Sequence, residues 1–139
     1  AWDYYRKICP AYIKDQKLHK VEPYVYSQMV AGKDAFRPGE GKNSWLTGTA
    51  AWNYYTITQF ILGIKPTYSG LKVEPCIPAD WKGYNVQRQF RGATYNIEVK
   101  NLSGSMKGIR SLKVDGKLID GDTIPIIPAG SVCNVEVEM

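Results

Sequence analysis

The first third of the chain shows a helical pattern of hydrophobic positions. Over residues 2 to 13 an apolar side chain recurs every three or four positions, at Trp2, Tyr5, Cys9 and Ile13. This spacing predicts a helix with one buried stripe. Pro10 falls inside the pattern and removes a backbone donor, so we expect the helix to break or kink there.

Two further helical segments are predicted before residue 65. The stretch EPYVYSQMVAG, residues 22 to 32, is apolar, with proline near its start and Gly32 suited to a C-cap. Residues 33 to 44 contain glycine and proline and predict a loop. A third helix is predicted from residue 49 to 62, ending at Gly63. Its apolar residues cover nearly all sides, which is typical of a helix inside a larger domain.

From about residue 70 the pattern becomes that of β-strands. Apolar and polar residues alternate, at least in part, in LKVEPCI, YNVQRQF, ATYNIEVKN, IRSLKVDG and VCNVEVEM. Short alternating segments at this spacing predict an antiparallel β-sandwich. Asp115 and Gly116 suit a type I′ hairpin turn. The junction GIKPTYSG therefore separates two expected domains: residues 1–65, the end of a helical domain, and residues 66–139, a β-sandwich.

Composition and charge exclude few partners but favour a soluble globular chain. The 139 residues are 44% hydrophobic and 22% charged, with a formal net charge of +5. Lysine and arginine are scattered, and no nucleic-acid-binding signature accompanies them, so we expect no nucleic-acid partner. No apolar run approaches the roughly 18 residues of a membrane span, so we expect no membrane partner.

The cysteines and the single histidine give no sign of a metal or disulfide framework. Cys9, Cys76 and Cys133 are widely spaced, and the first fifteen residues lack the order of a secretory signal. An odd number of cysteines without that signal favours reduced thiols and a cytoplasmic location. With one histidine and no clustered carboxylates, we expect no metal site and give His19 a structural or surface position.

The sequence also suggests that other polypeptide segments accompany this one. It starts at Ala1 without an initiator methionine. Two or three helices, one of them apolar all round, cannot form a full core by themselves. We therefore expect a fragment or processed piece of a larger protein, with the rest of that protein as a partner.

The stretch SWLTGTAAW is the strongest candidate for a binding site. Thr47, Gly48 and Thr49 lie where the third helix is expected to begin. The first N–H groups of a helix lack internal partners, carry partial positive charge and bind anions readily, most easily where glycine lets an anion approach. An ordinary N-cap threonine with a turn glycine explains the same residues, and the motif alone favours that capping interpretation.

Longer strings carry a family resemblance along essentially the whole chain. EPYVYSQMVAGKDA, GKNSWLTGTAAWN, QFILGIKPTYSGLKVEPCIP and FRGATYNIEVKN resemble, in the expected order, the C-terminal part of the disaccharide phosphorylases of glycoside hydrolase family ninety-four. These sequence strings look most similar to those of the family members that cleave cellobiose. The resemblance implies an α+β architecture, with the last helices of a six-hairpin (α/α) barrel followed by a C-terminal β-sandwich.

The resemblance also implies an activity. The family's glycosyltransferase-type reaction converts cellobiose and inorganic phosphate into α-glucose 1-phosphate and glucose, with inversion at the anomeric carbon. Phosphate is a substrate there, and no cofactor is expected. Family members are commonly homodimers, so the resemblance implies a homodimeric parent enzyme.

Site residues follow from the same resemblance, position by position. Thr47 matches a threonine whose hydroxyl contacts phosphate, and Gly48 would offer its backbone N–H to the same anion. Thr49 is a weaker phosphate candidate and is expected as an N-cap. Gln28 matches a glutamine that contacts the sugar in the glycosyl-donor subsite. The catalytic aspartic acid belongs to earlier barrel segments, and no aspartate here matches its motif, so we expect the isolated chain to be inactive.

Two other functional classes and several side chains remain open at this stage. The β-sandwich could be a carbohydrate-binding or structural module of a glycoside hydrolase, and a hydrolase of similar barrel build would act without phosphate. Trp45 and Trp52 could face sugar, but we expect them in a packed core. Arg88 and Arg91 are expected on a solvated or packing face.

Overall fold

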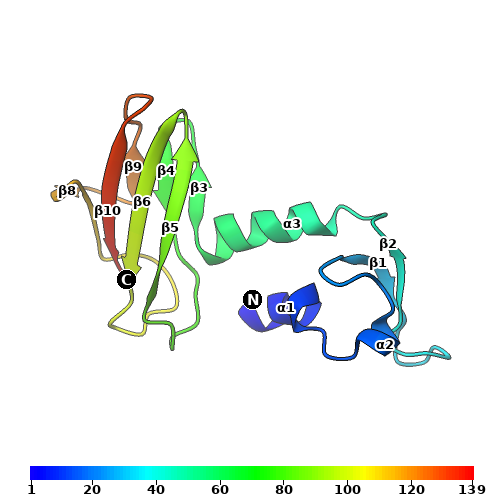
Figure 1. The fold of residues 1–139 in the computed structure, drawn as a ribbon. Helices are drawn as coiled ribbons and strands as arrows, with labels where there is room; N and C mark the ends of the chain where they lie inside the picture. The colour runs from blue at the N-terminus through cyan, green and yellow to red at the C-terminus, as the bar shows by residue number, and fades with distance from the viewer. The chain divides into compact units, whose positions relative to one another are not determined.

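The computed structural model describes residues 1–139 and divides into two compact units, residues 1–56 and 57–139. The elements of the first unit are short (Figure 1). They are α1 (Trp2–Ile8), the 3-10 helix η1 (Pro10–Tyr12), α2 (Gln16–His19), β1 (Ser27–Val30), β2 (Gly41–Ser44) and α3 (Thr49–Tyr55). The predicted domain boundary after residue 65 concerns the larger architecture and stays a prediction.

The break at Pro10 is confirmed. Helix α1 ends at Ile8, and Cys9 has extended backbone angles before Pro10 starts the 3-10 turn of η1. Proline is tolerated at this first position because its missing N–H would have no partner there.

The helix predicted over residues 22 to 32 is wrong. Residues Ser27–Val30 form strand β1, which pairs antiparallel with β2 in a register that places Ser27 opposite Ser44. An apolar run of this length does not distinguish a helix from a strand by periodicity. Pairing with residues 41–44, which were expected to be loop, decides the outcome.

The third predicted helix is confirmed, with one irregular half. Helix α3 covers Thr49–Tyr55 and continues as the π-helix η2 over Thr56–Ile61. The Leu62 N–H donates to the Ile57 carbonyl at 2.9 Å, the five-residue step of a π-helix. The chain then turns at Gly63, whose φ is +70°.

The second unit is a β-sandwich of two sheets, which Figure 1 shows as one layer behind the other. The five-stranded sheet has the order β5-β6-β10-β7-β8, and the three-stranded sheet has the order β3-β4-β9. The strands are β3 (Ile64–Pro66), β4 (Gly70–Val73), β5 (Gly83–Phe90), β6 (Ala93–Lys100), β7 (Ser111–Val114), β8 (Lys117–Ile119), β9 (Thr123–Pro125) and β10 (Val132–Glu138).

One strand pair departs from the predicted antiparallel arrangement. Strand β10 lies parallel to β6 over seven residue pairs and antiparallel to β7 on its other side. Alternation along a strand predicts which side chains are buried, but it carries no information about the direction of the neighbouring strand.

The core lies between the two sheets. Every second residue of β6 and β10 is buried, as the alternating pattern predicts. Tyr95 is fully buried and joins the layers, because its hydroxyl donates to the Pro125 carbonyl at 3.4 Å and accepts from the Ile127 N–H at 3.2 Å. The Tyr84 hydroxyl donates to the Leu62 carbonyl, which ties β5 to the end of η2.

Other expectations concern the hairpin turn and the absence of certain sites. Asp115 and Gly116 have φ values of +49° and +78° between β7 and β8, as a type I′ turn requires, so this prediction is confirmed. No helix is long and apolar enough to cross a membrane. No group of three or more potential metal-binding side chains occurs.

Two glycines with similar backbone angles should differ sharply in their tolerance of a methyl group. A Cβ at Gly63 would lie 2.2 Å from the Glu74 carbonyl oxygen, whereas nothing lies within 4 Å of a Cβ at Gly116. We expect Gly116→Ala to lower the free energy of unfolding by about 1 kcal/mol, which is the strain of a left-handed backbone in alanine. Gly63→Ala should cost about 3 kcal/mol or more, because overpacking is added.

Urea denaturation of the 139-residue chain would measure both costs. Equal losses for the two variants would contradict the close packing of Gly63 against Glu74.

Candidate functional site

The segment between β2 and α3 brings two of the predicted phosphate ligands together. The Thr47 and Thr49 hydroxyls are 2.6 Å apart and hydrogen-bonded to each other. The Thr49 N–H also donates to the Thr47 hydroxyl oxygen at 3.1 Å. Both threonines are half-buried, and these two contacts hold the Thr47 side chain against the first turn of α3.

The expected N-cap role of Thr49 is wrong. Helix α3 begins at Thr49, and Gly48 is its N-cap without any side-chain cap. The Thr47 hydroxyl accepts from the first helical N–H instead, in the manner of a Ser/Thr turn. When the Thr49 hydroxyl donates in the Thr47–Thr49 bond, the Thr47 oxygen accepts both contacts and its own O–H stays available as a donor.

Neither backbone angles nor crowding require glycine at position 48, although glycine is among the residues favoured at an N-cap. Its φ is −78°, a value that any residue adopts. An added Cβ would meet only Trp52 side-chain atoms, at 3.7 and 3.9 Å, which is ordinary van der Waals contact. Gly48 is exposed, and neither its backbone angles nor neighbouring atoms require the absence of a side chain at this position.

Gln28, the predicted sugar-binding residue, lies on strand β1 and is exposed. Its Oε1 accepts from the Asn43 Nδ2 at 3.0 Å, across the β1–β2 hairpin. Asn43 precedes Thr47 by four residues, so the hairpin links the two candidate positions. No direct hydrogen bond joins Gln28 to Thr47.

A mainly apolar pocket of about 480 Å³ lies within the first unit. Thr49 lines it together with Ser27 and Val30 of β1, and His19 contributes from α2. His19 is half-buried in this lining, consistent with a structural position. Burial, followed by the neighbouring Cys9, raises the pKa of Tyr26 in the same lining to about 12.

Trp45 and Trp52 were expected in a packed core, and this expectation is wrong. Trp45 is 73% exposed and Trp52 is 70% exposed. The Trp45 indole is nevertheless held, because its Nε1–H donates to Oε1 of Glu22 at 3.2 Å. Apolar pattern alone could not predict this, because the partner is 23 residues away in sequence.

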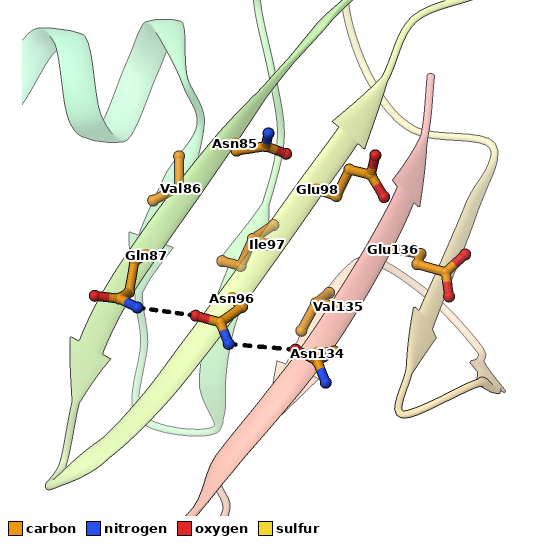
Figure 2. Close-up of a pocket in the computed structure, with 9 residues that line it drawn as sticks. All are labelled: Asn85, Val86, Gln87, Asn96, Ile97, Glu98, Asn134, Val135 and Glu136. Carbon is orange, nitrogen blue, oxygen red and sulfur yellow. Dashed lines mark hydrogen bonds between the residues drawn. The ribbon is translucent and has the colours of Figure 1, made fainter.

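The sandwich carries a second, shallow pocket that sequence patterns did not predict (Figure 2). It has a volume of about 460 Å³ and lies over the polar face of β5, β6 and β10. Gln87 donates to Asn96 at 3.1 Å, and Asn96 donates to Asn134 at 3.2 Å, forming a row across three strands. These amides satisfy one another, which is the usual way in which cross-strand polar pairs stabilise a sheet.

Arg88 lies on a packing face and Arg91 on a solvated one, the two kinds of position expected for them. Arg88 points with Tyr84 and Phe90 to the half-buried side of β5, and its buried Nε has no hydrogen-bond partner. Arg91 is exposed in the β5–β6 turn, where its guanidinium carbon lies 5.3 Å from the centroid of the Phe90 ring. Neither contributes to the threonine segment.

Comparison with known proteins shows which family the chain resembles. Residues 1–63 match the family model described as the glycosyl hydrolase 94 superfamily, catalytic domain. The N,N′-diacetylchitobiose phosphorylase of Vibrio furnissii is 47% identical over 116 residues, covering 84% of this chain and 14% of that protein. The solabiose phosphorylase of Paenibacillus borealis is 39% identical over 140 residues, covering 100% of this chain and 18% of that protein.

A more distant relative agrees with these two. The cellobionic acid phosphorylase of Neurospora crassa is 30% identical over 99 residues, covering 70% of this chain and 12% of that protein. The chain thus spans less than a fifth of the length of each of these curated relatives. The family model and the three relatives confirm the resemblance seen in the sequence strings, and the chain belongs to the glycosyl hydrolase 94 superfamily.

Proposed function

We propose that this chain is the C-terminal part of an inverting disaccharide phosphorylase, in which residues 1–65 complete a helical barrel and residues 66–139 form the terminal sandwich. The match of residues 1–63 to a catalytic-domain family supports this proposal. Relatives named as phosphorylases of three different disaccharides or sugar acids support the reaction class.

The chemistry of an inverting phosphorolysis explains what the chain must supply. An acid protonates the leaving oxygen while a nucleophile attacks the anomeric carbon from the opposite face. Phosphate is already an anion, so it replaces the water that a second carboxylate would otherwise activate. The protein must therefore hold phosphate in line with the bond to be broken, using donors that oppose its charge.

The bare backbone at Gly48 is the observation that carries the proposal. Because neither φ nor crowding requires glycine there, the missing side chain leaves the Gly48 N–H accessible from outside. The Thr47 hydroxyl lies beside it, half-exposed and held by Thr49. A backbone N–H and a hydroxyl in adjacent residues suit two oxygens of one phosphate.

The other two predicted residues take distinct roles in this proposal. Thr49 acts mainly through Thr47, because its hydroxyl and N–H both contact the Thr47 oxygen. Gln28 contacts the sugar in the donor subsite. Its amide is exposed and held by Asn43, so it can exchange hydrogen bonds with sugar hydroxyls.

The catalytic acid is proposed to come from another segment of the parent enzyme. The carboxylates of the first unit near the hairpin have other partners. Asp15 caps α2 through the Leu18 N–H at 2.9 Å, and Glu40 pairs with Lys20 and Lys42 at 3.2 and 3.0 Å. A threonine and a backbone amide cannot protonate a leaving sugar, so the chain by itself should not cleave a glycoside.

Cellobiose is the first proposed substrate, with α-glucose 1-phosphate and glucose as products. N,N′-diacetylchitobiose is a second candidate, supported by the 47% identical relative named for it. We further propose that the parent enzyme is a cytoplasmic homodimer that needs no cofactor.

A comparison of the 139-residue chain with the complete protein tests the proposal that the catalytic acid comes from another segment. The complete protein, incubated with cellobiose or N,N′-diacetylchitobiose, should release a sugar 1-phosphate only when inorganic phosphate is present. The 139-residue chain should release none. Phosphate-independent release of free sugar would indicate a hydrolase, and phosphorolysis by the chain alone would refute the proposed missing acid.

Substitutions at Thr47 and Gly48 should weaken phosphate binding in the complete protein. Thr47→Ala should raise the KM for phosphate at least about tenfold, because a hydrogen bond to a charged group is lost. Gly48→Ala should raise it to a similar extent by blocking the approach to the N–H. For Gly48→Ala the melting temperature should change by only about 2 °C, because the added Cβ meets only Trp52 side-chain atoms at ordinary van der Waals distances.

Gly32→Ala is the matched control for Gly48→Ala. A Cβ at Gly32 meets nothing within 4 Å, and a Cβ at Gly48 meets no atom closer than 3.7 Å, so neither substitution causes overpacking. Gly32 is exposed and follows the hairpin strand rather than the threonine segment. Its KM for phosphate should equal that of the unmodified protein. An unchanged KM for phosphate in both Thr47→Ala and Gly48→Ala would show that phosphate does not bind at this site.

A carbohydrate-binding module is the alternative that concerns the sandwich. Sugar-binding faces commonly present aromatic rings for stacking on sugar C–H groups. The polar face in Figure 2 presents amides and carboxylates, and its amide row is internally paired. We therefore expect calorimetry to detect no binding of cello-oligosaccharides to the 139-residue chain, whereas binding without phosphate would favour the module.

A further inference from the structure

The carboxylate of Glu22 contacts the segment that leads to Thr47. The Trp45 Nε1–H donates to Glu22 Oε1 at 3.2 Å. Hydrogen bonding by the Ser44 side chain, and to a smaller extent by the Glu22 backbone and the Trp45 indole, lowers the pKa of Glu22. The Glu22 side chain therefore reaches the residue that directly follows β2.

A tight turn holds Glu22 itself. The Val25 N–H donates to the Glu22 carbonyl at 3.2 Å, with Pro23 and Tyr24 between them. Tyr24 has a φ of +68°, a left-handed value at the position where such turns usually have glycine. Proline restricts the turn, so the Glu22 backbone is fixed in the segment that precedes β1.

The segment that Glu22 contacts is also conformationally demanding. Asn43 and Trp45 have φ values of +53° and +69°, which are uncommon for residues other than glycine. Such angles cost free energy and persist only where surrounding contacts determine them. Ser44, between them, pairs with Ser27 of β1. The Glu22 carboxylate supplies a contact on the Trp45 side chain, two residues before Thr47.

We propose that Glu22 is a positioning residue of the phosphate site, acting through Trp45 to fix the direction in which the chain presents Thr47 and Gly48. This inference rests on the proposed function. The same end of β2 holds Gln28 through Asn43, so it relates the phosphate ligands to the donor-sugar residue. Glu22 itself touches neither substrate in this arrangement.

The exposure of Glu22 argues for positioning rather than for general stability. Exposed polar pairs contribute little to the free energy of folding, because water competes for both partners. Glu40 provides the contrast within the same unit. Its side chain is only 12% exposed and binds Lys20 and Lys42, which stabilises the hairpin away from Thr47.

Steady-state phosphorolysis by variants of the complete protein tests this inference. Glu22→Ala should raise the KM for phosphate at least about fivefold, because small displacements of binding groups are costly. The KM for the disaccharide should change less. Trp45→Phe keeps an aromatic ring but removes the indole N–H that binds Glu22, so it should also raise the phosphate KM. Glu22→Gln keeps an acceptor oxygen and should retain most of the affinity.

Glu40→Gln is the structural control. It should lower the melting temperature without changing the KM for phosphate, while Glu22→Ala should change the KM with little effect on melting. If Glu22→Ala does not fold, the KM for phosphate of Trp45→Phe tests the proposal instead.

The outcomes separate this inference from the proposed function. If Thr47→Ala raises the phosphate KM but Glu22→Ala and Trp45→Phe do not, the positioning role is wrong and the phosphate site stands. If Thr47→Ala also has no effect, the phosphate site is wrong, and the positioning role fails with it.

Discussion

The contact between the Thr47 hydroxyl oxygen and the Thr49 N–H is the constraint on which the candidate site depends. It fixes a polar side chain at the point where the hairpin ends and α3 begins. With Thr47 held there, Gly48 becomes the N-cap and keeps an exposed backbone with an ordinary φ. Without the two contacts to Thr49, the hydroxyl would rotate more freely, and an anion would have to order it on binding.

The hairpin of β1 and β2 turns this local contact into a wider site. Strand pairing places Ser27 opposite Ser44, and side-chain contacts reach from Asn43 to Gln28 and from Trp45 to Glu22. These contacts span 15 and 23 residues of sequence. Such separation explains why short motifs identified Thr47 and Gly48 as candidates but gave no sign of the residues around them.

The sequence predicted the sandwich better than it predicted the first unit. Alternation gave the buried faces of β6 and β10 correctly, because a strand with one buried face must alternate. It could not give the parallel pairing of those two strands, which long-range assembly decides. The helix predicted over residues 22 to 32 failed for a related reason, since β1 exists only because residues 41–44 pair with it.

The chemical roles depended on the family resemblance rather than on local pattern. The motif alone favoured a capping threonine, and the structure shows that Thr47 does satisfy a helical N–H. Capping and ligand binding are compatible, because a hydroxyl oxygen accepts one bond and can still donate or accept another. The geometry thus removes the conflict between the two interpretations that the sequence left open.

A crystal structure of the complete protein with bound inorganic phosphate would test the central claim most directly. The account predicts phosphate oxygens at about 2.7–3.1 Å from the Thr47 Oγ1 and the Gly48 N–H. Phosphate bound elsewhere in an active enzyme, with Thr47 and Gly48 contacting only protein or water, would contradict it.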